Sequence, residues 1–328
     1  MNYKLKRILA IFVFLILNSQ LLTPNSFAAS SQRGTSAANF LKIIPGARQA
    51  GMAGVAVALA DDVFTLHGNP GGIALLPQGQ FAASRVSYFQ SIDFNYLGTV
   101  LPLPLKGPAG EHRHSVGLSI TNLQVDGIEK RTSDQDTPEG TFAAGDYAYQ
   151  VSYGRKMGHS FYGRDWSLGG SVKHINSKID SFSASAWALD AGILVHNPVA
   201  HMRRAGFSIR NLGTEMKFNE VGDPLPLAVS LGGLMGLMGD KLSVVPEINI
   251  PRDNDVSAAL GLEYTMAIKG DFSMALRGGF TTGTSVKSGL HGVSAGLGFG
   301  SKAFGFDFGW VPFGDLGDTF RYSLIAKF

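Results

Sequence analysis

Phe320-Arg-Tyr-Ser-Leu-Ile-Ala-Lys-Phe328 closes the chain and alternates in polarity. Successive side chains of a strand point to opposite faces, so Phe320, Tyr322, Leu324 and Phe328 share one face. C-terminal segments of soluble domains usually fray. An alternating strand that ends on an aromatic is instead typical of the strand that closes an outer-membrane barrel. An edge strand of a soluble domain is the alternative.

The N-terminal residues favour the membrane interpretation. Lys4, Lys6 and Arg7 precede an apolar run, and Ser26-Phe27-Ala28 places small residues where a signal peptidase cleaves. The run of about ten residues is too short to cross a bilayer core of about 30 Å as a helix. We therefore expect export and cleavage after Ala28, with a retained anchor as the alternative, and a location in the bacterial outer membrane.

The composition agrees with an exported β protein. The chain has 42 Gly and 45% hydrophobic residues, but 16% charged residues, against about 25% in ordinary domains. Its apolar residues are dispersed in alternation, as expected for a closed sheet in lipid. The formal net charge is +3 and the basic residues form no stripe, so nucleic-acid binding is not expected. The absence of Cys excludes disulfides and thiolate sites.

Alternation divides the chain into three parts. Residues 1–28 are the expected signal peptide, residues 29–80 a small-residue segment without period two, and residues 81–328 the barrel. The middle part includes Gly46-Ala-Arg-Gln-Ala-Gly-Met-Ala-Gly54, which predicts a short helix with a small face, and Gly68-Asn-Pro-Gly-Gly72, which predicts a turn. After it we find about fourteen alternating stretches, an even number suited to a barrel. These stretches lie near 80–88, 92–103, 114–123, 146–155, 165–176, 183–195, 203–212, 225–233, 241–250, 256–266, 271–280, 289–299, 303–311 and 319–328.

The connection predicted at 124–145 is long and charged, so it should project into water. Charged residues also occupy mid-strand positions opposite the apolar faces, which predicts a charge network inside the barrel. These residues are Lys173, Asp190, Arg210, Glu247, Glu263, Arg277 and Asp307. Burying unpaired charges costs several kcal/mol each. They must therefore pair across the lumen or be reached by water. Salt-bridged filling is the plainer role, and selectivity or substrate binding is the alternative.

Several motifs in order resemble one family of outer-membrane proteins. The stretch Gly46 to Gly54 with Arg48 and Gly51, the Asp61-Asp62 step and the turn Asn69-Pro70-Gly71-Gly72 resemble the N-terminal hatch of the FadL superfamily, specifically its PorV/PorQ-like branch. Further segments agree in order and spacing. They are Asp126-Gly-Ile-Glu-Lys-Arg131, Tyr153-Gly-Arg155, Asn211-Leu-Gly213, Asp223-Pro-Leu-Pro-Leu227, Pro251-Arg-Asp-Asn-Asp255, Gly261-Leu-Glu-Tyr264 and Pro312-Phe-Gly-Asp-Leu-Gly317.

The resemblance implies a fold and two alternative functions. The fold is a transmembrane antiparallel β-barrel of fourteen strands with a small helical hatch in its lumen. A PorV-like protein would serve type IX secretion by binding cargo C-terminal domains or translocon proteins. A FadL-like protein would passively transport hydrophobic small molecules such as long-chain fatty acids. The family turn usually reads Asn-Pro-Ala-Gly, so Gly71 is a departure that puts hatch mobility or packing in question.

No motif predicts catalysis, a cofactor or a metal. Gly46 to Gly54 lacks the Gly-Lys-Ser/Thr of a phosphate loop, and no Gly-x-Ser-x-Gly elbow is present. His112 and His114 lack a second ligand cluster. We therefore expect a non-enzymatic protein. Its expected partners are outer-membrane lipids, the barrel-assembly machinery and either secretion proteins or a hydrophobic ligand.

The barrel assignment predicts a simple biochemical signature. The unheated protein should migrate anomalously on a detergent gel and give a β-rich circular dichroism spectrum, because a closed barrel resists unfolding in detergent. A spectrum with substantial helix would contradict it.

Overall fold

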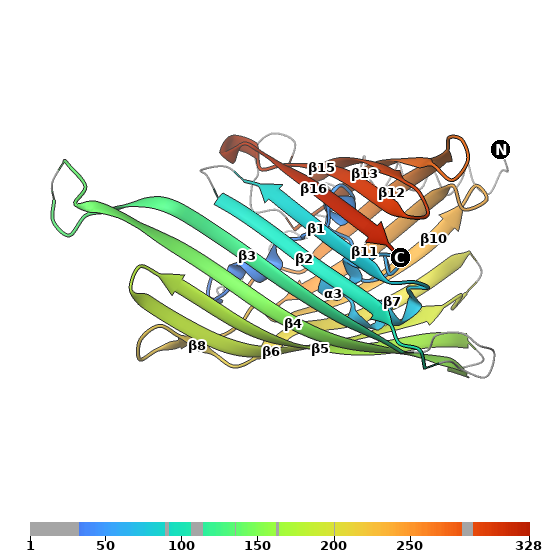
Figure 1. Ribbon diagram of the computed structural model, residues 1–328, viewed down its shortest axis with the longest axis horizontal. Helices are drawn as coiled ribbons and strands as arrows, with labels where there is room; N and C mark the ends of the chain where they lie inside the picture. The colour runs from blue at the N-terminus through green and yellow to red at the C-terminus, as the bar shows by residue number, and fades with distance from the viewer. Residues whose placement is uncertain are drawn as a thin grey trace.

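The computed structural model describes residues 33–88, 92–105, 114–134, 136–161, 164–199, 201–283 and 291–328. The predicted signal peptide and its cleavage site lie outside these residues. Fourteen antiparallel strands form a closed barrel in the order β1-β16-β15-β14-β13-β12-β11-β10-β7-β6-β5-β4-β3-β2 (Figure 1). The strands are β1 (Gln80–Ser87), β2 (Ile92–Pro102), β3 (His114–Lys130), β4 (Gly140–Phe161), β5 (Arg164–Ile179), β6 (Phe182–His196), β7 (Met202–Gly213), β10 (Ala228–Leu237), β11 (Leu242–Pro251), β12 (Ser257–Ala267), β13 (Ser273–Thr281), β14 (Val293–Gly300), β15 (Phe304–Pro312) and β16 (Asp318–Lys327). A two-stranded sheet, β8 (Met216–Lys217) with β9 (Gly222–Asp223), lies in the β7–β10 connection. The predicted barrel is confirmed.

The first and last strands close the sheet. β1 pairs with β16 from Gln80 opposite Lys327 to Ser87 opposite Phe320. Beyond the ladder, the Phe328 amide donates to the Gly79 carbonyl at 2.9 Å. Because closure leaves no open sheet edge, the wall's backbone groups can be paired within lipid. No helix in the described parts of the chain is long and apolar enough to span a bilayer.

The barrel has two distinct ends. The end that carries Gly79 and Phe328 is called here the terminal end, and the opposite end, with the β3–β4 connection, the hairpin end. β3 and β4 continue past their neighbours at the hairpin end, since β2 stops opposite Val125 and β5 stops opposite Ala144 (Figure 1). The resulting two-stranded ribbon projects from the barrel.

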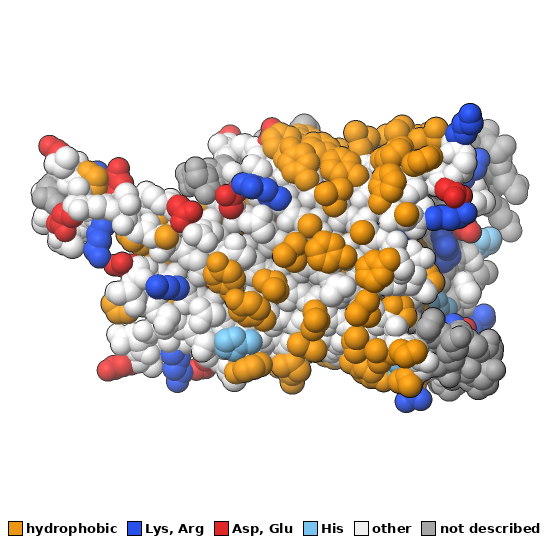
Figure 2. Space-filling model, in the orientation of Figure 1, with side chains coloured by type: hydrophobic (Ala, Val, Ile, Leu, Met, Phe, Trp, Pro, Cys, Tyr) orange, Lys and Arg blue, Asp and Glu red, His pale blue; other side chains and the backbone are white. Residues whose placement is uncertain are grey.

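The ribbon corrects one prediction. The expected loop over 124–145 is mostly strand, because β3 runs to Lys130 and β4 begins at Gly140. Both faces of a projecting ribbon meet water, so its sequence carries no alternation of apolar and polar residues to reveal the strands. Its charged side chains are exposed, as expected (Figure 2).

Large apolar side chains cover the outside of the barrel between its ends. Exposed examples include Tyr149, Trp187, Leu262, Phe306 and Leu324. Figure 2 shows them as scattered patches over the barrel body, whereas charges gather at its ends. This distribution is that of a transmembrane barrel with a lipid-facing outer surface.

Residues 33–79 run through the lumen from one end of the barrel to the other. At the hairpin end, the Ala37 amide donates to the Pro224 carbonyl, and Lys42 pairs with Asp253 of the β11–β12 connection. At the terminal end, the segment leaves at Gly79 beside Phe328. Figure 1 shows it as blue ribbon enclosed by strands. We call residues 33–79 the hatch.

The hatch contains only short helices of one or two turns. They are η2 (Asn39–Lys42), α2 (Ala47–Ala50), α3 (Thr65–Gly68) and η3 (Pro70–Leu75). The helix expected from the small residues of Gly46 to Gly54 therefore stops after one turn. Ala53 and Gly54 have φ angles of 60° and 82°, values incompatible with a right-handed α-helix.

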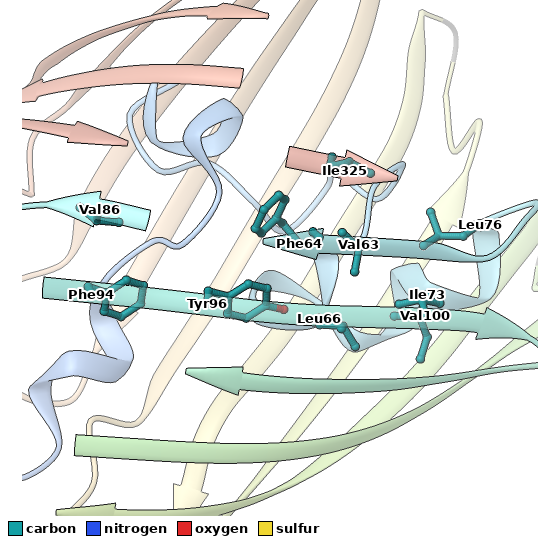
Figure 3. Close-up of a cluster of buried hydrophobic side chains, with 11 residues drawn as sticks. Val63, Phe64, Leu66, Ile73, Leu76, Val86, Phe94, Tyr96, Val100 and Ile325 are labelled. Atoms are coloured by element: carbon teal, nitrogen blue, oxygen red, sulfur yellow. The ribbon is translucent and has the colours of Figure 1, made fainter. Parts of the chain in front are cut away.

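Apolar clusters join the hatch to the inner wall. Phe64 and Leu66 of the hatch pack with Phe94 and Tyr96 of β2 and Ile325 of β16 (Figure 3). The Phe64 and Tyr96 ring centroids are 5.4 Å apart. A second cluster holds Phe40 and Leu41 against β4, β5 and β6, and a third holds Met52, Val55, Ala58 and Leu59 against β10 and β11. The lumen is thus filled like a protein core near the hatch.

Glycines of the inner wall permit this close approach. A Cβ added at Gly206 of β7 would lie 2.6 Å from the Val57 carbonyl oxygen, and one at Gly309 of β15 would lie 2.7 Å from that of Ala47. Gly279 of β13 faces the backbone of Met52 and Ala53 even more closely. Part of the high glycine content therefore serves contact between two backbones.

Two adjacent glycines of β13 give a matched test. Gly279→Val should destabilise the protein by about 1–3 kcal/mol, because the added carbons overpack the hatch contact. Gly278→Val should have little effect, since its Cβ would meet its nearest atom at 3.9 Å. Urea unfolding in lipid vesicles measures both variants. Equal shifts for the two would contradict the close packing.

Candidate functional site

Most of the candidate site residues predicted from the sequence lie where the hatch contacts the inner wall. The hatch backbone is largely irregular, so it needs hydrogen-bond partners from outside itself. Wall side chains supply several of them. The Ser84 hydroxyl of β1 donates to the Pro45 carbonyl at 2.5 Å, and the Ser323 hydroxyl of β16 accepts from the Ala47 amide at 2.9 Å.

The same arrangement recurs around the barrel. The Ser294 hydroxyl of β14 accepts from the Ala53 amide at 2.7 Å. The Gln150 amide of β4 donates to the Leu66 carbonyl at 2.9 Å. These bonds fix the hatch to opposite sides of the wall.

The side chain of Glu247 of β11 binds backbone amides of the hatch. One of its carboxylate oxygens accepts from the amides of Ala56 and Val57 at 2.7 and 2.9 Å. Glu247 is buried, so these two charge-assisted bonds stabilise a carboxylate removed from water. The predicted lumen residue thus contacts the hatch.

The turn at Asn69 packs closely against the inner wall. The Asn69 Nδ2 donates to the Val57 carbonyl at 3.0 Å and to the Ile193 carbonyl of β6 at 3.1 Å, while its Oδ1 accepts from the Gly71 amide at 3.0 Å. Pro70 opens η3. A Cβ at Gly71 would lie 2.7 Å from the Gly192 carbonyl oxygen. Alanine, usual in this turn among the resembled family, would therefore need this wall contact to shift.

Gly72 serves packing within the hatch. A Cβ there would collide with Thr65 and Ala60. Gly46 precedes α2 and touches Gln49 and Phe64, and Gly51 follows α2 against the β14 backbone. Gly46 and Gly51 therefore permit close contacts, and Gly54 lies where the helix has ended.

Arg48 of α2 links the hatch to a chain of charged wall residues. Its guanidinium donates to both carboxylate oxygens of Glu263 of β12, at 2.8 and 2.7 Å. Arg277 of β13 donates to Glu263 at 2.7 Å and to Asp307 of β15 at 2.7 Å. Bidentate arginine contacts are strong and directional. Four of the predicted site residues thus form one buried network.

The network extends to the Asp61-Asp62 step. Arg48 contacts Asp61 at 2.5 Å and Asp62 at 3.3 Å, and Arg204 of β7 reaches Asp61 at 3.3 Å. The Asp61 side chain is 43% exposed, so water reaches this side of the network. Asp62 is buried, and its carboxylate also accepts from the Phe64 amide at 2.9 Å.

The two neighbouring carboxyl groups have opposite electrostatics. Burial raises the pKa of Asp62, in the hatch, to about 6, although Arg48 opposes the rise. For Asp61, attraction to Arg48 and Arg204 outweighs the opposing effect of partial desolvation and holds its pKa below the usual range. Asp61 is therefore the stably ionised partner of Arg48.

A second network lies where β5, β6 and β7 meet. Lys173 pairs with Asp190 at 2.6 Å and donates to the Asn211 amide oxygen at 2.8 Å. Asp190 also accepts from the Asn211 backbone amide at 2.7 Å, where the β6–β7 ladder shifts register. Arg210 reaches the Ser230 hydroxyl at 3.3 Å and the Asn249 amide oxygen at 3.5 Å. Lys173 and Asp190 thus pair with each other, whereas Arg210 bonds to neutral side chains of β10 and β11.

The predicted terminal-strand residues lie away from these networks. Phe320, Tyr322 and Phe328 are exposed on the outer face of the barrel, and Tyr322 stands opposite Arg85 in the β1–β16 ladder. Their part in closing the barrel during assembly stays a prediction. The structure therefore separates the predicted residues into a lumen group and a lipid-facing group.

Several contact residues were missed in the sequence. Arg204 shares its inward face with Arg210, so the same alternation could have identified it. Gln150, Ser84, Ser294 and Ser323 are also inward-facing, but nothing in the pattern distinguishes them from other polar lumen residues. Within the described residues, no group of three acidic or histidine side chains is placed to hold a metal.

Comparison with known proteins places this geometry in context. The family model described as "Type IX secretion system protein PorV" matches residues 27–251. Solved structures with a similar fold include the P. putida toluene transporter TodX, with 9% identity, coverage of 86% of this chain and 98% of that one, and a TM-score of 0.56. The Ralstonia pickettii toluene transporter TbuX has 11% identity, coverage of 86% and 97%, and a TM-score of 0.53. A Pseudomonas aeruginosa FadL homologue has 11% identity, coverage of 87% and 98%, and a TM-score of 0.52. No curated protein matches the chain.

The Arg48 network predicts a large effect of one substitution. Arg48→Met should lower the free energy of unfolding by about 3 kcal/mol, because it leaves the buried Asp62 without its arginine partner and takes one of two arginines from each of Glu263 and Asp61. Arg85→Met removes an exposed pair with Asp93, so its effect should stay below about 1 kcal/mol. Urea titration of vesicle-embedded protein measures both. A smaller loss for Arg48→Met than for Arg85→Met would refute the role given to the network.

Proposed function

Because the chain belongs to the PorV family of type IX secretion system proteins, we propose that it binds secretion partners at its hairpin end and passes no solute through its lumen. It is an outer-membrane barrel of the FadL superfamily. The proposed partners are cargo C-terminal domains or translocon proteins. The protein is proposed to be non-enzymatic.

The observation that carries this proposal is the set of hydrogen bonds and ion pairs between the hatch and the inner wall. Its backbone is bonded to side chains of β1, β4, β11, β14 and β16, the Asn69 side chain bonds to the β6 backbone, and Arg48 joins the hatch to β12. Passage of a hydrophobic molecule would require many of these contacts to break together. Because the inner glycines fit the hatch backbone closely, a small shift of the hatch would also meet steric resistance. The transporter alternative is therefore the less supported one.

The projecting β3–β4 ribbon is the proposed contact surface. It stands clear of the membrane-covered wall, where a protein partner can reach it (Figure 1). Its acidic residues Asp126, Glu129, Asp134, Asp136 and Glu139 outnumber Lys130 and Arg131. This charge would favour a partner with a basic surface. Lys130, the last residue of β3, pairs with Asp180 at 2.6 Å and so links the ribbon to the β5–β6 turn.

Removing the ribbon tests the proposal. Val125 and Ala144 are opposite each other in the ladder, so residues 126–143 can be replaced by Asn-Gly, a pair suited to a two-residue hairpin. Export of a type IX cargo should fall at least about tenfold, the effect of losing about 1.4 kcal/mol of binding. The assay compares cargo outside the cell and in the periplasm.

A control variant separates partner binding from barrel damage. Lys302→Ala removes an exposed pair with Asp271 at the terminal end and should leave export unchanged. Heat-modified migration on a gel verifies that both barrels are folded. Normal export by a folded barrel without the ribbon would overturn the proposed contact surface.

A further inference from the structure

The outer wall carries a groove across β4, β5, β6 and β7. It has a volume of about 490 Å³ and includes Gly170 and Ala191 among its lining residues. The strand register explains its shape. Tyr153, Gly170, Ala191 and Ile209 form one row across the four strands.

Two rows of larger residues flank this row. Val151, Val172, Leu189 and Leu212 lie on the hairpin-end side, and Arg155, Leu168, Ile193 and Phe207 lie on the terminal-end side. Gly170 and Ala191 are the smallest residues among the three rows, so they leave a depression between the flanking side chains. The groove therefore runs across the strands, with these two residues as its floor.

The groove belongs to the lipid-facing surface. Val151, Val172, Leu189 and Leu212 are between 46% and 60% exposed, although all are apolar. The inward neighbours Ser152, Ser171 and Asp190 are buried. The four strands are paired beneath the groove, with a register shift in the β6–β7 ladder at Asp190, so the groove is a hollow in a closed wall. An apolar groove at this depth suits a hydrocarbon chain.

One end of the groove has a polar, basic rim. Arg155 is exposed on the outer face of β4, two residues beyond Tyr153 towards the terminal end. The Tyr153 hydroxyl lies 2.5 Å from His114 Nδ1 of β3. Lys156 and Asp165, farther along, lie 3.9 Å apart and offset each other's charge. The exposed guanidinium therefore stands at the mouth of an apolar groove, where an anionic head group would be favoured.

We propose that this groove is a binding site for one anionic glycerophospholipid. One acyl chain lies over Gly170 and Ala191, and the phosphate contacts Arg155 in the leaflet at the terminal end. The positive charge of Arg155 favours an anionic head group, and the apolar floor favours an acyl chain. This site is independent of the proposed role in secretion, because it lies on the lateral wall rather than on the ribbon.

Native mass spectrometry of the full chain in detergent tests the site. The probes are phosphatidylglycerol and phosphatidylcholine with matched acyl chains. Wild type should retain one phosphatidylglycerol in preference to phosphatidylcholine. Ala191→Leu should lower that retention about tenfold, because the new side chain displaces buried methylenes. Arg155→Gln should lower it about fivefold and leave phosphatidylcholine retention unchanged.

Two further variants keep the test decisive. Ala295→Leu adds the same bulk on the outer face of β14, away from the groove, and should behave as wild type. Gly170→Ala adds a single methyl group whose nearest neighbour would lie at 3.5 Å. It therefore probes the floor even if Ala191→Leu does not fold. Equal retention of phosphatidylglycerol by Gly170→Ala and Ala295→Leu would overturn the site. Preferential retention of lipopolysaccharide that Arg155→Gln does not change would also overturn it.

Discussion

An irregular chain enclosed by a sheet must find hydrogen-bond partners on a wall whose own backbone is already paired. The structure meets this constraint with inward side chains. Serines, a glutamine and Glu247 reach the hatch amides and carbonyls, and glycines elsewhere let the two backbones touch. The ion pair of Arg48 with the carboxylate of Glu263 joins the hatch to the wall as well. The filled lumen follows from this fit, and it is the observation that supports the proposed binding role over transport.

The barrel could be predicted from the sequence because its signal is local. Period-two alternation marks each of the fourteen strands, and most predicted bounds lie within a few residues of the observed ones. The exceptions have physical causes. β3 and β4 extend into water, where both faces are polar and alternation is lost. The hatch helix stops after one turn because contacts with the wall, and positive φ at Ala53 and Gly54, override local propensity.

The candidate site was predictable only in part. Strand parity placed Glu263, Arg277 and Asp307 inside the barrel, and they lie there. It could not reveal that Arg48 completes their network, because the path of a segment without alternation is set by tertiary contacts. The closeness of Gly192 to Asn69 was hidden for the same reason. Sequence gives the face of a strand residue, but pairing between distant segments requires the three-dimensional path.

The route of the hatch has a consequence for biogenesis. The hatch enters at the hairpin end beside Pro224 and leaves at the terminal end beside Phe328, and it bonds to both β1 and β16. Once those strands have joined, such a segment could reach its place only by threading lengthwise through the pore. A sheet that wraps around the hatch before β1 and β16 pair avoids this threading, so we expect the hatch to be in place before the barrel closes.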